Sequence, residues 1–206
     1  MSFPVSVRRA LTITVLGFIL AAPAALAQPP GDSHNVGASH IKPPTTGPLL
    51  LNPYEAALKL EQMGDYNHAI ELLEPEAKQG AGYEMAQLEL GRCYLAVAKK
   101  AATPEVALEA TKKGGAWIET AAEAGLSEAQ EQMARLYIEG GHFKVEPVEA
   151  GKWYTLWKAN PKRFQAVGKP FDPKLEQKLK STLTDAQWAQ ARQAAMDLAR
   201  RAGPPQ

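Results

Sequence analysis

Two segments of the chain repeat each other, and this internal repeat constrains the fold more than any other feature. The segment Ala86–Tyr94 (AQLELGRCY) returns as Ala129–Tyr137 (AQEQMARLY), with the same Ala-Gln opening and closing Tyr. A looser second half follows each copy and carries Trp117 and then Trp153 at matching positions. A repeat of roughly 20 to 50 residues with apolar positions at helical spacing is typical of a helical solenoid. We therefore predict a chain of stacked helix pairs.

Helix-start signals recur along the chain, whereas no stretch alternates as a strand does. Asn52-Pro53, Thr103-Pro104 and Asp172-Pro173 each place a capping residue before a proline in the first helical turn. The sequence therefore predicts an all-α fold. We expect helices over 53–63, 67–74, 83–99, 104–124, 127–139 and 147–160, a short helix from 173 towards 183, and a last helix after Thr184.

Four local features refine these boundaries. Pro75 is expected to end or kink the second helix near Glu74. Gly114-Gly115 lies inside a helical run, where it either breaks the helix or permits a close approach to a neighbouring helix. Ser127 with Gln130 and Thr184 with Gln187 have the spacing of capping boxes at helix starts.

The N-terminus has the pattern of a secretory signal peptide over residues 1–27. Arg8 and Arg9 precede the mostly apolar stretch 10–22, and Ala25-Leu26-Ala27 matches a cleavage site after Ala27. An uncleaved membrane anchor is the alternative, although the stretch is slightly short for a bilayer. Cleavage predicts a protein of the periplasm or the extracellular medium without stable membrane insertion.

The remaining chain divides by composition. Residues 28–51 are rich in proline and lack an apolar period, so we expect a disordered linker. Residues 52–161 hold the repeats, 162–202 the C-terminal capping helices, and 203–206 a tail. Removing residues 1–27 takes away two arginines and no acid, which leaves 21 Lys+Arg against 22 Asp+Glu. A near-neutral chain argues against a nucleic-acid partner.

The repeated pattern resembles the Sel-one-like repeat, a relative of the tetratricopeptide repeat. The resemblance covers about 52–161 and departs at Ala134 and Pro161, where glycines are expected. It implies a short right-handed α-solenoid of helical hairpins with a C-terminal capping helix, in a bacterial protein that binds a protein partner as an adaptor or regulator. The residues that carry it are Ala86, Leu90, Gly91, Tyr94, Trp117, Ala121, Ala122 and Gly125.

In such a solenoid the partner binds the concave face, which the first helix of each hairpin lines. Transferring the tetratricopeptide register predicts seven outward-facing residues: Tyr54, Leu58, Arg92, Leu95, Glu131, Arg135 and Glu139. Arg92 and Arg135 occupy the same repeat position, so aligned guanidinium groups would receive acidic residues or a peptide carboxylate. Two solvated arginines are the alternative.

No catalytic, cofactor or metal motif stands out, so we expect a non-enzymatic protein without a cofactor or metal. His34 and His40 lack the companions of a metal site. Two rivals remain: an envelope enzyme or glycan- or peptide-binding factor that uses scattered residues such as Glu139, His142 and Trp157, and a subunit that works only inside an oligomer. The lone Cys93 is either a buried helix residue or one half of an intermolecular disulfide.

Overall fold

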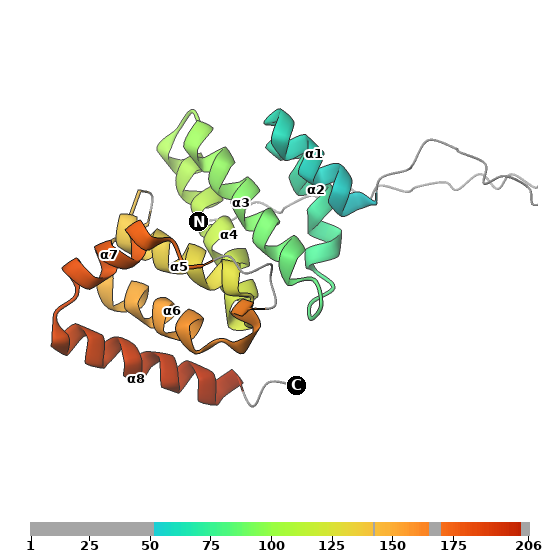
Figure 1. Cartoon of the computed structure of the whole chain (residues 1–206). Helices are drawn as coiled ribbons and strands as arrows, with labels where there is room; N and C mark the ends of the chain where they lie inside the picture. Colours follow the sequence, from blue (N-terminus) through green and yellow to red (C-terminus); the bar gives the residue numbers. More distant parts are fainter. Residues whose placement is uncertain (1–51, 142, 165–169, 203–206) are drawn as a thin grey trace, which may run out of the picture. The chain divides into compact units, whose positions relative to one another are not determined.

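The computed structural model describes residues 52–141, 143–164 and 170–202, and every regular element within these ranges is a helix (Figure 1). The predicted all-α class is confirmed. The elements are α1 (Pro53–Met63), α2 (Tyr66–Ala77), α3 (Glu84–Lys100), α4 (Pro104–Glu123), α5 (Ser127–Glu139), α6 (Pro147–Ala159), a short 3-10 turn (Pro161–Phe164), α7 (Pro173–Thr182) and α8 (Asp185–Ala202).

Local capping accounts for most of the helix starts. Asn52 Oδ1 accepts a hydrogen bond from the Glu55 amide at 2.8 Å, so α1 begins at Pro53. The Thr184–Gln187 capping box is formed in both directions. The Gln187 amide donates to Thr184 Oγ1 at 3.3 Å, and the Thr184 amide donates to Gln187 Oε1 at 3.0 Å.

The predicted end of α2 near Glu74 is wrong, because the helix continues through Pro75 to Ala77. The amide of Lys78 still donates to the Glu74 carbonyl at 3.1 Å. Leu73 and Ala77 are both buried, on either side of the proline. Their packing outweighs the cost of an interior proline, which is about 3 kcal/mol.

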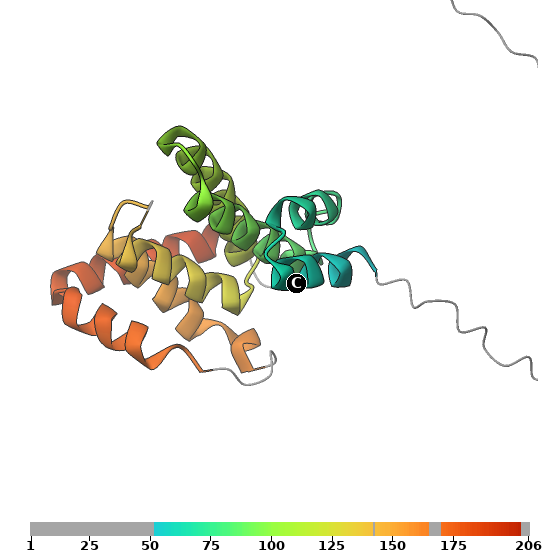
Figure 2. The ribbon, with the colours of Figure 1, turned by 90° about the horizontal axis from the view of Figure 1, so that it is seen from above.

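Consecutive helices pack against each other in chain order from α1 to α6, and α8 packs along α6 (Figures 1 and 2). The shorter α7 contacts α5 and α6. This order is typical of stacked helical hairpins. The right-handed superhelix implied by the family resemblance stays a prediction.

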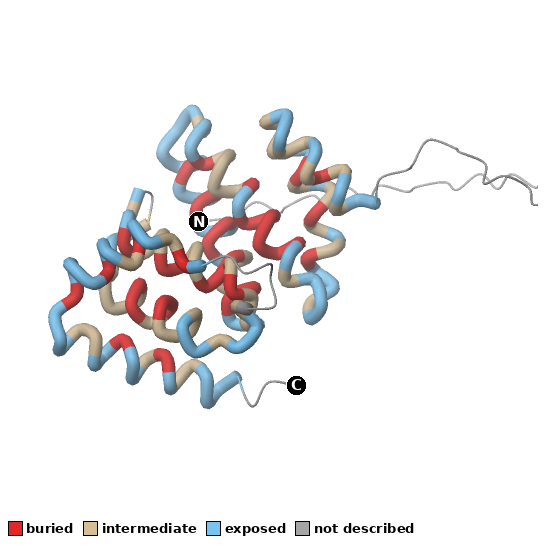
Figure 3. Tube along the Cα trace, viewed as in Figure 1, coloured by how far each residue is buried: buried red, intermediate tan, exposed pale blue. Residues whose placement is uncertain are grey.

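The buried residues, red in Figure 3, include two apolar clusters, and α3 contributes to both. The first cluster joins α1, α2 and α3 around Leu73 and Leu90. The second draws on every helix from α3 through α8 and centres on Ile118, Met133 and the fully buried Trp153. Because each cluster draws on more than one helix pair, a single pair does not bury its own apolar face.

The repeated Ala-Gln pair has a structural role in both copies. Gln87 and Gln130 are buried and each side-chain amide reaches the end of a preceding helix. Gln87 Nε2 donates to the Ala77 carbonyl, and Gln130 Nε2 donates to the Ala122 carbonyl, each at 3.1 Å. Each of these carbonyls also accepts a backbone amide, from Gly80 and from Gly125, so the glutamine adds a second bond that ties its helix to the preceding helix end. The predicted Ser127–Gln130 capping box is therefore wrong: Ser127 is the first residue of α5, and Leu126 precedes it as the N-cap.

Glycines let α3 and α4 approach each other closely. A Cβ atom added at Gly91 would lie 2.7 Å from the Gly114 carbonyl oxygen, and one added at Gly114 would lie 2.7 Å from the Gly91 carbonyl oxygen. The helix α4 runs unbroken through Gly114-Gly115. Of the two interpretations of this pair, the close approach is therefore correct.

The predicted signal peptide (1–27), linker (28–51) and tail (203–206) lie outside the described residues, as does His142. In the ranges that the structure describes, no helix combines the length and the apolar character needed to cross a membrane.

Candidate functional site

An open groove of about 590 Å³ lies between α3 and α5, the first helices of two consecutive hairpins. Four of the seven predicted partner-binding residues line it: Arg92 and Leu95 from α3, and Arg135 and Glu139 from α5. The remaining lining residues are Ala96, Lys99, Gln132, Leu136, Gly140, Gly141 and Phe143. The equivalent helices of the two repeat copies thus share one concave site.

The other predicted residues lie outside the groove lining. Tyr54 and Leu58 are half-buried on α1, and Tyr54 packs against the first apolar cluster. Burial, followed by the nearby Glu89 and Glu61 carboxylates, raises the pKa of Tyr54. Its phenol therefore stays protonated at neutral pH. Glu131 lies on α5 and contacts Arg135 without lining the groove.

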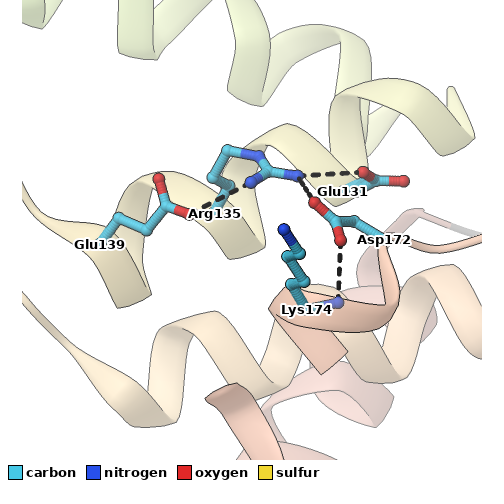
Figure 4. Close-up of polar contacts among 5 residues, drawn as sticks. All are labelled: Glu131, Arg135, Glu139, Asp172 and Lys174. Carbon is cyan, nitrogen blue, oxygen red and sulfur yellow. Dashed lines mark hydrogen bonds and ion pairs between the residues drawn. The ribbon is translucent and has the colours of Figure 1, made fainter. Parts of the chain in front are cut away.

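Arg135 is bound within the chain by three carboxylates (Figure 4). Its Nη1 lies 3.1 Å from Glu139 Oε1, and its Nη2 lies 3.4 Å from Glu131 Oε1 and 2.8 Å from Asp172 Oδ2. Asp172 Oδ1 also accepts from the Lys174 amide at 2.9 Å, as the N-cap of α7. These bonds join α5 to the start of α7.

This arrangement changes the hypothesis that Arg92 and Arg135 together bind the acidic groups of a partner. Three acids already surround Arg135 and neutralise its charge, so it attracts a partner's carboxylate less than an unpaired arginine would. The Arg135 hydrogen bond, together with the Lys174 amide, lowers the pKa of Asp172. The pair is therefore charged at neutral pH and acts as a tie between helices.

Arg92 is engaged on one side only. Its Nη1 lies 2.7 Å from Glu89 Oε1, while 42% of the Arg92 side chain remains exposed. Glu89 is buried, and this burial raises its pKa although Arg92 opposes the shift. Arg92 therefore faces the groove as a cation whose charge is partly balanced by Glu89.

Lys99 is exposed at the groove edge and forms no ion pair or hydrogen bond with any residue of the described ranges. Leu95, Ala96, Leu136 and Phe143 supply apolar lining. The Phe143 ring packs edge-on against Tyr137, with ring centroids 6.1 Å apart. The groove thus combines apolar surface with an unpaired cation.

Some groove-lining residues that the sequence did not predict follow from helical spacing, whereas Phe143 does not. Ala96 and Lys99 follow Arg92 at helical spacing, and Gln132 precedes Arg135 at the same spacing, so extending the register along each helix would have included them. Phe143 comes from the connection after α5. No periodic signal marks a connecting segment.

Cys93 is fully buried, as one of its two interpretations predicts. Its Sγ donates to Glu61 Oε1 at 2.8 Å, which links α3 to α1. Burial first, and then the hydrogen bond to Glu61, raises the pKa of the thiol far above its usual value. A buried neutral thiol is a poor nucleophile and a poor partner for an intermolecular disulfide.

The residues suggested for a catalytic rival do not converge where the structure describes them. Asn160 Nδ2 donates to the Gly125 carbonyl at 2.8 Å, so the end of α6 lies beside the start of α5. Trp157 is near that end of α6, whereas Glu139 closes α5 at the other end of the hairpin. Across the described ranges, no group of three or more His, Cys, Asp or Glu side chains is placed to hold a metal ion.

Comparison with known proteins adds no assignment. No protein-family model matches the chain, and the search of curated proteins finds no match.

Proposed function

We propose that this protein is a non-catalytic binding scaffold or regulator of the bacterial cell envelope, built from Sel-one-like repeats and exported by its N-terminal signal. It binds one protein partner in the groove between α3 and α5. The observation that carries the proposal is the shared lining of this groove by equivalent helices of the two repeat copies. Repeat proteins commonly use such a face for partner recognition.

The groove favours an extended peptide segment that pairs an apolar side chain with an acidic one. The apolar side chain packs between Leu95, Leu136 and Phe143. The acidic side chain lies beside Lys99, which has no ion-pair partner in the described part of the chain, and within reach of Arg92. Arg135 keeps its internal acids and shapes the floor.

The experiment selects ligands from a phage-displayed random peptide library and measures their affinities by fluorescence anisotropy. We expect enriched peptides to combine apolar and acidic residues. Lys99→Glu is expected to weaken their binding about tenfold, because it replaces an attraction by a like-charge contact. Lys112→Glu is the matched control, since Lys112 is also exposed but lies on α4 outside the groove.

Two results would contradict the proposal. One is a set of enriched peptides that binds wild type and Lys99→Glu equally well. The other is an equal loss in Lys99→Glu and Lys112→Glu, which would indicate general electrostatic attraction rather than a site.

A further inference from the structure

A second hollow lies away from the groove, where α6, α7 and α8 meet. It has a volume of about 340 Å³. Its lining is Tyr154, Thr155, Lys158, Lys180, Trp188 and Arg192. This size is at the lower end of the range for small-molecule pockets.

The floor of the hollow is aromatic, and its polar groups are already engaged. Tyr154 and Trp188 meet edge to face with ring centroids 5.8 Å apart. The Tyr154 hydroxyl donates to Glu176 Oε1 at 2.6 Å, and Thr155 Oγ1 donates to the Gly151 carbonyl at 2.8 Å. Because Tyr154 is itself buried, the floor offers the half-buried ring of Trp188 rather than free hydrogen-bonding groups.

The rim is cationic and contains no carboxylate. Lys180 lies 2.6 Å from Glu176 Oε1, a partly exposed carboxylate that does not line the hollow but also interacts with the charge of Lys158. Lys158 and Arg192 are exposed and form no ion pair with any residue that the structure describes. Burial and the hydrogen bond to Glu176 raise the pKa of Tyr154, so its phenol adds no negative charge. Arg192 and Lys158 are therefore the cations that face an occupant, and Glu176 opposes part of the Lys158 charge.

We propose that this hollow binds a small aromatic carboxylate. The ring of the ligand packs on Trp188, and its carboxylate receives hydrogen bonds from Arg192 and Lys158. A planar guanidinium suits a carboxylate because it donates two parallel N–H bonds. The half-buried indole of Trp188 supplies the flat apolar surface that an aromatic ring requires. This site is independent of the groove and of the proposed partner.

The test titrates 2-naphthoate into the full chain and follows the indole N–H signal of Trp188 by two-dimensional NMR. We expect a saturable shift at submillimolar concentration. The neutral analogue 2-naphthamide, which keeps the rings but lacks the charge, is expected to bind about tenfold more weakly.

Two variants assign the charge. Arg192→Gln is expected to weaken 2-naphthoate binding about tenfold, since it removes one charged donor. Arg201→Gln makes the same charge change on the same exposed helix outside the hollow and is expected to leave the affinity unchanged. A non-saturable Trp188 response, equal affinity for the amide, or an equal loss in both variants would overturn the proposal.

Discussion

The contact between α3 and α4 predicts that a single methyl group at Gly91 destabilises the fold. In Gly91→Ala the new Cβ would lie 2.5 Å from Ile118 Cγ1 and 2.7 Å from the Gly114 carbonyl oxygen. The Gly114 atom belongs to the backbone, so no side-chain rotation can relieve the overlap. The two helices must move apart, and both take part in the apolar clusters.

The size of the effect follows from two opposing contributions. Overpacking a well-packed contact costs about 1–3 kcal/mol, and a backbone overlap belongs at the upper end of that range. Replacing glycine by alanine inside a helix returns about 1 kcal/mol of helix propensity. We therefore expect Gly91→Ala to lower the free energy of unfolding by about 2 kcal/mol, or Tm by roughly 4–8 °C.

Gly115→Ala is the matched control on the facing helix. Its added Cβ would lie 2.5 Å from Phe143 Cζ, the tip of a side chain that can rotate away. We expect its stability to stay within about 1 kcal/mol of wild type. Urea unfolding followed by far-ultraviolet circular dichroism measures both variants. Gly91→Ala as stable as wild type would refute the close-packing argument.

Three further predictions follow from buried and charged contacts. Gln130→Leu removes the buried bonds to the Ala122 carbonyl and from the Asn160 amide and should lower the free energy of unfolding by about 1–2 kcal/mol; an unchanged urea midpoint would contradict this. Cys93 should react with Ellman's reagent only after unfolding, because burial and Glu61 raise its pKa, and full reaction without denaturant would contradict its place in the core. The lowered pKa of Asp172 means that its tie to Arg135 stabilises the fold above the unfolded pKa of about 3.9 and is lost as pH falls through the lower folded value. Asp172→Asn should therefore be less stable than wild type at pH 7, with a gap that narrows at pH 3; urea unfolding at both values measures it, and a constant gap would show that the charge is not involved.

Helix boundaries were predictable wherever the signal is local. Asn52-Pro53 and the Thr184–Gln187 box determine a helix start by bonds within four residues, so the chain reveals them directly. The sequence does not predict the roles of Pro75 and Gln130, because both depend on contacts with residues of other helices. The first is held in a helix by burial on either side, and the second donates to the end of the previous helix.

The groove was only partly predictable for the same reason. Repeat equivalence placed Arg92 and Arg135 on one face, and the structure brings both into the groove lining. The sequence alone does not show that Asp172, far along the chain, forms an ion pair with Arg135. The repeat pattern predicted that Arg135 is available to a partner's acidic group. In the structure Lys99 is the more accessible cation.

The most direct test of the proposed scaffold places a photo-crosslinking amino acid in the groove in living cells. Gln132 is suitable because it lines the groove and is half-buried, whereas Lys112 on α4 provides an exposed control position. We predict one discrete crosslinked partner from position 132 that disappears when Lys99→Glu is added, and no such product from position 112. The same product from both positions, or one that survives Lys99→Glu, would contradict the groove as the binding site.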